Sequence, residues 1–143
     1  MKRLVLIGMA GAVLSGIVLA QDGARQAGPN SGANKSVERG RYLVHHVAMC
    51  VQCHSPRDVK GNLDSRRLLT GARIPVASPF PDSVWAFAAP RLTGAPGWTQ
   101  EEFVALLTTG KRPGAPAPRS PMPKYQMTEE DAAAVYTYLN SLE

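Results

Sequence analysis

The chain has 143 residues, of which 44% are hydrophobic, 19% charged and only 6% aromatic, and its formal net charge is +5. This length suits one small domain, and the mild basic excess comes without the aromatic and basic interleaving that nucleic-acid binding requires. The sequence also lacks a Ser/His/Asp set, a carboxylate pair or a phosphate-binding loop, so no common catalytic site is indicated.

Residues 1–20 have the features of a secretory signal peptide. Lys2 and Arg3 form a basic head, residues 4–20 are uncharged and mostly apolar, and the chain turns polar directly after Ala20. Such a pattern is typical of exported proteins, so we expect cleavage after Ala20 and a periplasmic location. The alternative is an uncleaved anchor, because the apolar run is just long enough to span a bilayer. Membrane association is expected only if this segment is retained, or through a complex.

Residues 21–35 are rich in Gly, Ala, Asn and Gln and show no apolar periodicity. Such a segment cannot bury enough apolar surface to fold on its own. We therefore predict a flexible leader over residues 21–35 and one folded domain over residues 36–143.

The first predicted helix runs from Val37 to Met49, with Ser36 as its N-cap. Apolar or small residues recur within it at spacings of three and four, which gives the helix one apolar face. Its end leads directly into the two cysteines of the chain.

These cysteines lie in the segment Cys50-Val51-Gln52-Cys53-His54, which is a C-x-x-C-H motif. This spacing is the attachment signature of a c-type haem. Two intervening residues place both thiols on one face of a helical turn, where each can form a thioether with a haem vinyl group. The next residue, His54, can then bind the iron axially. We therefore predict one covalent haem c, held by Cys50 and Cys53.

Other uses of this motif fit less well. A redox dithiol expects a βαβ setting, which the flanking residues do not indicate. A zinc site needs four ligands, and the remaining histidines, His45 and His46, lie on the helix just upstream. A disulfide across two residues would constrain almost nothing.

Two further helices are predicted over residues 100–109 and 129–142. Thr99 and Thr128 are their N-caps, acidic residues follow each cap, where the helix dipole favours them, and Gly110 ends the first of the two. Their apolar stripes consist of Phe103, Leu106 and Leu107, and of Ala132, Val135, Tyr136, Leu139 and Leu142.

Between the helices the chain is rich in proline and glycine. Most prolines lie in residues 55–98 and 110–123, and those of the second segment are too closely spaced for a helix or a central strand. A short extended pair is predicted around Ile74-Val76 and Trp85-Phe87. A domain with so much loop needs a further source of core, and a buried haem supplies a large apolar body.

Two methionines are candidates for the second axial ligand of the iron. Met122 stands between Pro121 and Pro123, which stiffen the chain and can hold the sulfur against the iron. Met127 directly precedes the Thr128 cap, where an apolar residue usually packs on the first helical turn. We therefore favour Met122, and a thioether ligand would raise the redox potential.

The chain resembles class I cytochromes c, which are monohaem electron carriers. The resemblance covers residues 37–142 and implies an all-α cytochrome c fold, with three main helices and long Pro- and Gly-rich loops wrapped around one haem. It rests on three motifs in order, namely Glu38–Leu43 leading to Cys50–His54, Ala88–Thr93 followed by Gly97-Trp98, and Met122–Tyr125 leading into the last helix.

The resemblance implies roles for residues around the haem. Pro90 would lend its carbonyl to the Nδ1–H of His54, which fixes the ring and makes it a better donor. Leu92 would pack on the haem. Gly40 would let the first helix cross the last one closely near Tyr138.

At the haem propionates the resemblance implies two further partners. Trp98 would donate its indole N–H to a propionate, with simple core packing as the alternative, and Arg112 would neutralise one. Arg91 departs from the family pattern, in which Asn commonly follows the proline. This departure puts the local hydrogen bonding in question.

The function implied by the resemblance is one-electron transfer. The expected partners are redox proteins, with an exported dehydrogenase as donor and a cytochrome or oxidase of the respiratory chain as acceptor. The chain would then be an electron carrier, or the cytochrome subunit of a dehydrogenase complex, and not an enzyme. The alternative is a haem protein with an open or labile sixth site, acting as an enzyme subunit or a gas-binding protein.

Overall fold

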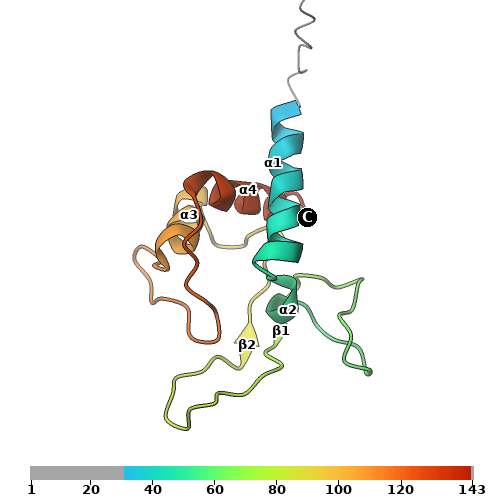
Figure 1. The fold of residues 1–143 in the computed structure, drawn as a ribbon, viewed down its shortest axis with the longest axis vertical. Helices are drawn as coiled ribbons and strands as arrows, with labels where there is room; N and C mark the ends of the chain where they lie inside the picture. Colours follow the sequence, from blue (N-terminus) through green and yellow to red (C-terminus); the bar gives the residue numbers. More distant parts are fainter. Residues whose placement is uncertain (1–30, 143) are drawn as a thin grey trace, which may run out of the picture.

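The computed structural model describes residues 31–142, so the predicted signal peptide, its cleavage site and residues 21–30 of the predicted leader lie outside the described residues. Nearly all regular secondary structure in this part of the chain is helical, and long loops join the helices (Figure 1). None of these helices combines the length and the apolar character that a membrane span requires. Its elements are α1 (Ser31–Tyr42), the π-helical turn η1 (Leu43–Val47), α2 (Val51–His54), β1 (Ala72–Arg73), β2 (Ala88–Ala89), α3 (Gln100–Thr109) and α4 (Glu129–Asn140).

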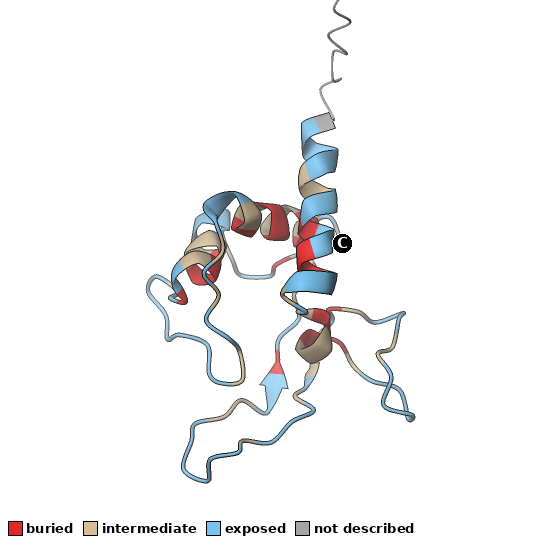
Figure 2. Ribbon diagram, in the orientation of Figure 1, coloured by how far each residue is buried: buried red, intermediate tan, exposed pale blue. Residues whose placement is uncertain are grey.

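The three predicted helices correspond to α1 with η1, to α3 and to α4, while the four-residue helix α2 is an addition. Buried residues gather where α1 and α3 each pack against α4, and the long loops are mostly exposed (Figure 2). The all-α class is thus confirmed for the described residues, because the strands are only two residues long.

The first helix differs from its prediction at both ends. It begins at Ser31, so Ser36 lies inside the helix instead of capping it, and residues 31–35 of the predicted leader are helical. The prediction relied on an apolar face, which the sequence of residues 31–35 does not provide, and residues 32–35 are exposed. A helix that is already nucleated can nevertheless extend through such residues at little cost. At the other end, Ala48 donates its N–H to the Leu43 carbonyl at 2.8 Å and closes the π turn before Met49.

Helices α1 and α4 cross at Gly40, which is buried. A Cβ at this position would lie 2.6 Å from the Tyr138 Cβ and still closer to the Ala134 carbonyl oxygen. Only glycine permits this approach, as the sequence analysis expected. Beside the crossing, Arg39 donates to both carboxylate oxygens of Asp131 at 2.8 and 2.9 Å.

Helix α3 has the predicted bounds and caps. The Thr99 hydroxyl accepts from the Glu102 N–H, and the Glu102 carboxylate accepts from the Thr99 N–H, which makes a complete capping box. Gly110 ends the helix in the left-handed conformation, with φ at 72°. The predicted stripe of Phe103, Leu106 and Leu107 is buried.

Helix α4 is also capped as predicted, since the Thr128 hydroxyl accepts from the Asp131 N–H, but it ends at Asn140. The predicted stripe is confirmed at Ala132, Val135 and Leu139, which are buried. Tyr136 and Leu142 are only half-buried. Tyr138 is buried instead of Tyr136, because α1 approaches that side of the helix at Gly40.

The predicted extended pair exists, but its ladder is displaced toward the base of the loop. Ala72 pairs with Ala89 and Arg73 pairs with Ala88 in antiparallel register. One further hydrogen bond, from the Ile74 N–H to the Phe87 carbonyl at 2.9 Å, falls in the predicted segments. Short pairing is expected here, because the prolines that follow cannot continue a ladder.

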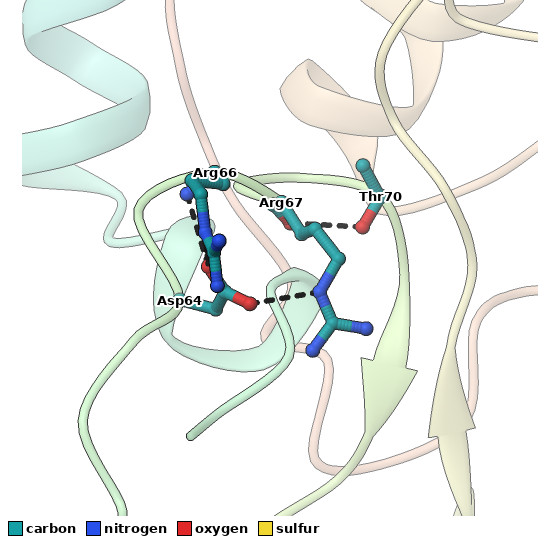
Figure 3. A network of polar contacts seen from close by, with 4 residues as sticks. All are labelled: Asp64, Arg66, Arg67 and Thr70. Atoms are coloured by element: carbon teal, nitrogen blue, oxygen red, sulfur yellow. Dashed lines mark hydrogen bonds and ion pairs between the residues drawn. The ribbon is translucent and has the colours of Figure 1, made fainter.

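The loop after α2 is organised by Asp64 (Figure 3). Its carboxylate accepts from the Arg67 Nε at 2.8 Å and from the Arg66 N–H at 3.1 Å. The Thr70 hydroxyl donates to the Arg67 carbonyl at 2.8 Å and closes the turn. Because these bonds are local, they give the loop a defined shape without a large core of its own.

Candidate functional site

The C-x-x-C-H motif lies on the short helix α2. Cys50 is its N-cap, and the His54 N–H donates to the Cys50 carbonyl at 3.0 Å, which closes one helical turn. Both thiols are free. Cys50, Cys53 and His54 line the same cavity. The one-turn geometry expected from the spacing is therefore present.

This cavity has a volume of about 470 Å³, and its walls are mainly apolar. Its lining residues come from α2, β2, α3, α4 and the loops between them, whereas no residue of α1 or η1 lines it. Among its lining residues are Leu92, Trp98, Phe103, Leu106, Val135 and Leu139. An apolar cavity with a few convergent polar groups is the usual form of a cofactor site.

The His54 imidazole is buried and held by one hydrogen bond. Its Nδ1 lies 2.8 Å from the Pro90 carbonyl oxygen, which can only accept, so Nδ1 carries the proton. Burial lowers the pKa of His54, and the bond to Pro90 partly opposes this shift. The neutral ring therefore keeps the lone pair on Nε2, which is the form that binds a metal.

A series of hydrogen bonds connects the end of α2 to residues 69–71 and, through them, to Leu92. The Gly71 N–H donates to the His54 carbonyl at 2.9 Å, and the Leu69 N–H donates to the Ser55 hydroxyl at the same distance. Leu69 in turn accepts from the Leu92 N–H at 2.8 Å. This series of bonds ties α2 to the segment that carries the Pro90 carbonyl and so fixes the ring.

Three methionines differ in their relation to the cavity. Met122 and Met49 line it, and Met127 does not. Met127 packs against the hydrophobic core, and its N–H donates to the Leu107 carbonyl at 3.0 Å. Met49 directly precedes Cys50 and is 42% exposed. Met122 reaches the cavity from the separate proline-rich loop.

The upstream histidines lie outside this cavity. His45 forms a 2.8 Å hydrogen bond with the Tyr138 hydroxyl at the helix crossing, and His46 is exposed. Neither lines the walls around Cys50. His45 therefore belongs to the crossing of α1 and α4, and His46 lies on the surface.

Arg112 and Trp98 lie together at the cavity wall. The Arg112 guanidinium carbon is 3.8 Å from the centre of the Trp98 ring, and Arg112 donates to the Gly97 carbonyl at 2.8 Å. The Nε of Arg112 is buried and has no hydrogen-bond partner among residues 31–142. A buried donor of this kind needs an acceptor, and a haem propionate would supply one. With two thiols and an imidazole on the same cavity, the residues fit haem c.

Sequence reasoning missed Tyr125, which lines the cavity. Its hydroxyl donates to the Ala48 carbonyl at 2.7 Å, and burial raises the pKa of the phenol well above its usual range. This bond joins the Met122 loop to the residues just before the motif. The available signal was an aromatic residue in an otherwise polar and proline-rich segment.

The departure at Arg91 leaves the local hydrogen bonding satisfied. Its Nε donates to the Thr93 carbonyl at 2.9 Å and to the Thr93 hydroxyl at 2.6 Å. The backbone at Gly71 also lies close to the backbone at Arg91, because a Cβ on Gly71 would be 2.9 Å from the Arg91 backbone nitrogen. The segment that carries Pro90 is therefore held despite the change.

Comparison with known proteins shows the family of the chain. Residues 35–139 match the family described as "Cytochrome C oxidase, cbb3-type, subunit III". The chain is 31% identical over 120 residues to a fructose dehydrogenase cytochrome subunit of Gluconobacter japonicus, which covers 76% of this chain and 22% of that protein. It is 30% identical over 108 residues to a diheme cytochrome c-type protein of Cereibacter sphaeroides, and this match covers 71% of this chain and 34% of that protein.

A third relative is a nicotinate dehydrogenase subunit of Pseudomonas putida, with 31% identity over 131 residues, 86% of this chain and 10% of that protein. The chain thus spans about a third or less of the length of each of these curated relatives. What it shares with them is one domain of a larger protein.

Proposed function

Because the chain belongs to the c-type cytochrome family described as "Cytochrome C oxidase, cbb3-type, subunit III", and so carries covalent haem c, we propose that it is an exported electron carrier with His54 and Met122 as axial ligands. The observation that supports this most is that both thiols, His54 and Met122 line one apolar cavity. Haem c supplies a one-electron ferric–ferrous couple.

The residues of the cavity have distinct tasks in this proposal. Cys50 and Cys53 hold the group covalently. The Pro90 carbonyl, 2.8 Å from Nδ1, orients the His54 ring and strengthens its Nε2 as a donor. Leu92 and the other apolar walls exclude water, and the soft thioether of Met122 favours the reduced state.

The haem periphery would be held by the polar pair at the wall. The Arg112 Nε, buried without a partner in the described part of the chain, would donate to a propionate. The indole N–H of Trp98 makes no hydrogen bond within residues 31–142. The Trp98 ring packs edge-on against the Phe103 ring, with 5.7 Å between the ring centres. Its N–H would therefore serve the same charged group. This arrangement suits a single buried haem wrapped by loops and three main helices.

A ligand set with two protein residues leaves no open site for a substrate. Keeping both ligands in both oxidation states also minimises structural change during electron transfer. We therefore propose a carrier and not an enzyme, and this distinguishes it from a haem protein with an open or labile sixth site.

The partners follow from the relatives. One is named as the cytochrome subunit of fructose dehydrogenase, and another as a subunit of nicotinate dehydrogenase. We propose that a dehydrogenase donates electrons to this chain and that a cytochrome or an oxidase of the respiratory chain accepts them. With the signal peptide removed after Ala20, this exchange would take place in the periplasm.

The absorption spectrum of the exported, haem-loaded protein tests the proposal. Sharp c-type bands with a methionine–iron charge-transfer band are expected. Met122→Ala should keep the haem attached, remove that band, admit CO and lower the potential. Met127→Ala and Met49→Ala are matched controls that should keep the band. A high-spin spectrum and ready CO binding in the unaltered protein would rule out the carrier.

A further inference from the structure

The loop between β1 and β2, residues 74–87, is mostly exposed (Figure 2). Several of its exposed residues have large apolar side chains. Phe87 is 85% exposed and Phe80 is 68% exposed, and Val84 and Val76 follow at 69% and 55%. These four make up half of the exposed large hydrophobic residues in the described part of the chain. Exposed apolar groups gathered in this way mark an interaction site, whereas single ones are ordinary.

This loop has a defined conformation although it is exposed. The Trp85 indole N–H donates to the Val76 carbonyl at 3.1 Å and spans the loop. At the tip, the Ser78 and Ser83 hydroxyls both donate to the Phe80 carbonyl, at 2.8 and 3.0 Å. A surface that is already ordered loses less conformational entropy when a partner binds it.

The loop is joined to the rim of the cavity. The Ala86 N–H donates to the Ser120 carbonyl at 2.8 Å, and Trp85 forms a parallel bridge with Ser120. Ile74, Ala86 and Arg119 all line the cavity. The loop therefore adjoins the rim of the proposed haem cavity, where a docked partner would come close to the haem.

The charged side chains beside this surface are mainly basic. Arg73 directly precedes the loop and Arg119 lies beside Ser120. Both are exposed, and neither makes an ion pair within residues 31–142. Asp82 is the only acidic residue of the apolar loop. Such a rim is complementary to carboxylates.

We propose that residues 74–87, together with Arg73 and Arg119, form the surface on which the redox partner docks, and that the partner presents an apolar patch rimmed by acidic side chains. This inference rests on the proposed electron-carrier function and specifies its partner surface. The apolar centre would supply contact area, and the arginines would steer the encounter.

An anionic lipid surface is the other occupant with matching chemistry. The structure favours a protein, because Asp82 lies at the tip between Phe80 and Val84, where immersion would bring a carboxylate to lipid phosphates. Lipid on this face would also cover the cavity rim that a partner must reach.

Electron transfer to an acidic protein tests the surface. The reduced, haem-loaded full chain is mixed with oxidised plastocyanin, an acidic copper protein, in a stopped-flow instrument. One electron leaves the ferrous haem, which becomes ferric, and reduces copper(II) to copper(I). The second-order rate constant is measured across a range of ionic strengths.

Two double variants should slow this reaction by about tenfold each, Phe80→Ser/Phe87→Ser through lost contact and Arg73→Glu/Arg119→Glu through lost attraction. The arginine variant should also flatten the dependence on ionic strength. The matched controls are Val59→Ser, an exposed apolar residue outside this loop, and Lys35→Glu, an exposed cation on α1. Both should stay within about twofold of the unaltered chain, since they lie off the docking surface.

Equal rates in all variants would overturn the docking surface. So would binding of the unaltered chain, but not of the phenylalanine variant, to phosphatidylglycerol vesicles. Failure of the carrier function itself looks different, because the unaltered chain would then show a high-spin spectrum and bind CO readily. The two failures are thus separable.

Discussion

Replacing Gly40 by alanine tests the helix crossing that holds the first helix, and with it the haem motif, against the rest of the fold. Helix propensity alone favours alanine over glycine by about 1 kcal/mol. The added Cβ would, however, lie 2.6 Å from the Tyr138 Cβ. Carbon atoms in ordinary contact are roughly 3.5–4.0 Å apart, so the two helices must separate by about 1 Å.

The cost of this separation should exceed the propensity gain. Overpacking of a core typically costs about 1–3 kcal/mol. The upper end applies here, because the nearest obstacle is the Ala134 carbonyl, a backbone group that cannot rotate away. We expect Gly40→Ala to lose about 1–2 kcal/mol of unfolding free energy, or roughly 4–8 °C in Tm for a domain of this size. Unfolding of the haem-loaded protein by guanidinium measures the loss of free energy, and thermal unfolding measures the change in Tm.

Gly32→Ala is the matched control, since it makes the same change in the same helix. A Cβ added at Gly32 meets no atom within 4 Å, so only the propensity gain remains and the variant should be neutral or slightly stabilised. If Gly40→Ala proves as stable as Gly32→Ala, the close crossing of α1 and α4 does not exist in solution and the reasoning is refuted.

Three other predictions concern the polar contacts. Tyr125→Phe removes the donor to the Ala48 carbonyl and should cost about 1 kcal/mol in urea unfolding, with no loss if the bond is absent. Arg112→Gln removes a cation from the cavity wall, which should lower the midpoint potential in a redox titration; an unchanged or higher value would contradict this. Hydrogen bonds from Arg39 hold the pKa of Asp131 below its ordinary value of 3.8. The ion pair therefore stabilises the fold at pH values above 3.8, and this stabilisation is lost as the pH falls through the lowered pKa of Asp131. Asp131→Asn should therefore be less stable at neutral pH and approach the unaltered chain in acid, and a constant difference would refute the pairing.

The haem prediction depended on local chemistry and was available from the sequence. A motif of five consecutive residues needs no tertiary information, because its spacing alone defines one helical turn. The caps at Thr99 and Thr128 were predictable for the same reason, since each side chain bonds to a backbone group three residues away. The assignment of Met122 as a ligand stays a prediction until the spectra are measured.

Non-local features were harder to predict. The start of α1 was placed too late because its first turns are exposed and carry no apolar pattern. The choice between Tyr136 and Tyr138 as the buried side chain depended on where α1 crosses α4. The bond from Tyr125 to Ala48 joins residues 77 positions apart.

The sequence by itself determined the cofactor, the helical class, both ends of α3 and the start of α4, because these depend on groups within a few residues of one another. Only the tertiary structure decided which distant side chains share the cavity, that the Arg112 Nε is buried without a partner in the described residues, and that the apolar loop 74–87 is joined at Ser120 to the rim of the site. Those relations arise when α1 and α4 pack through Gly40 and the loops close around the cavity, and no local pattern encodes them.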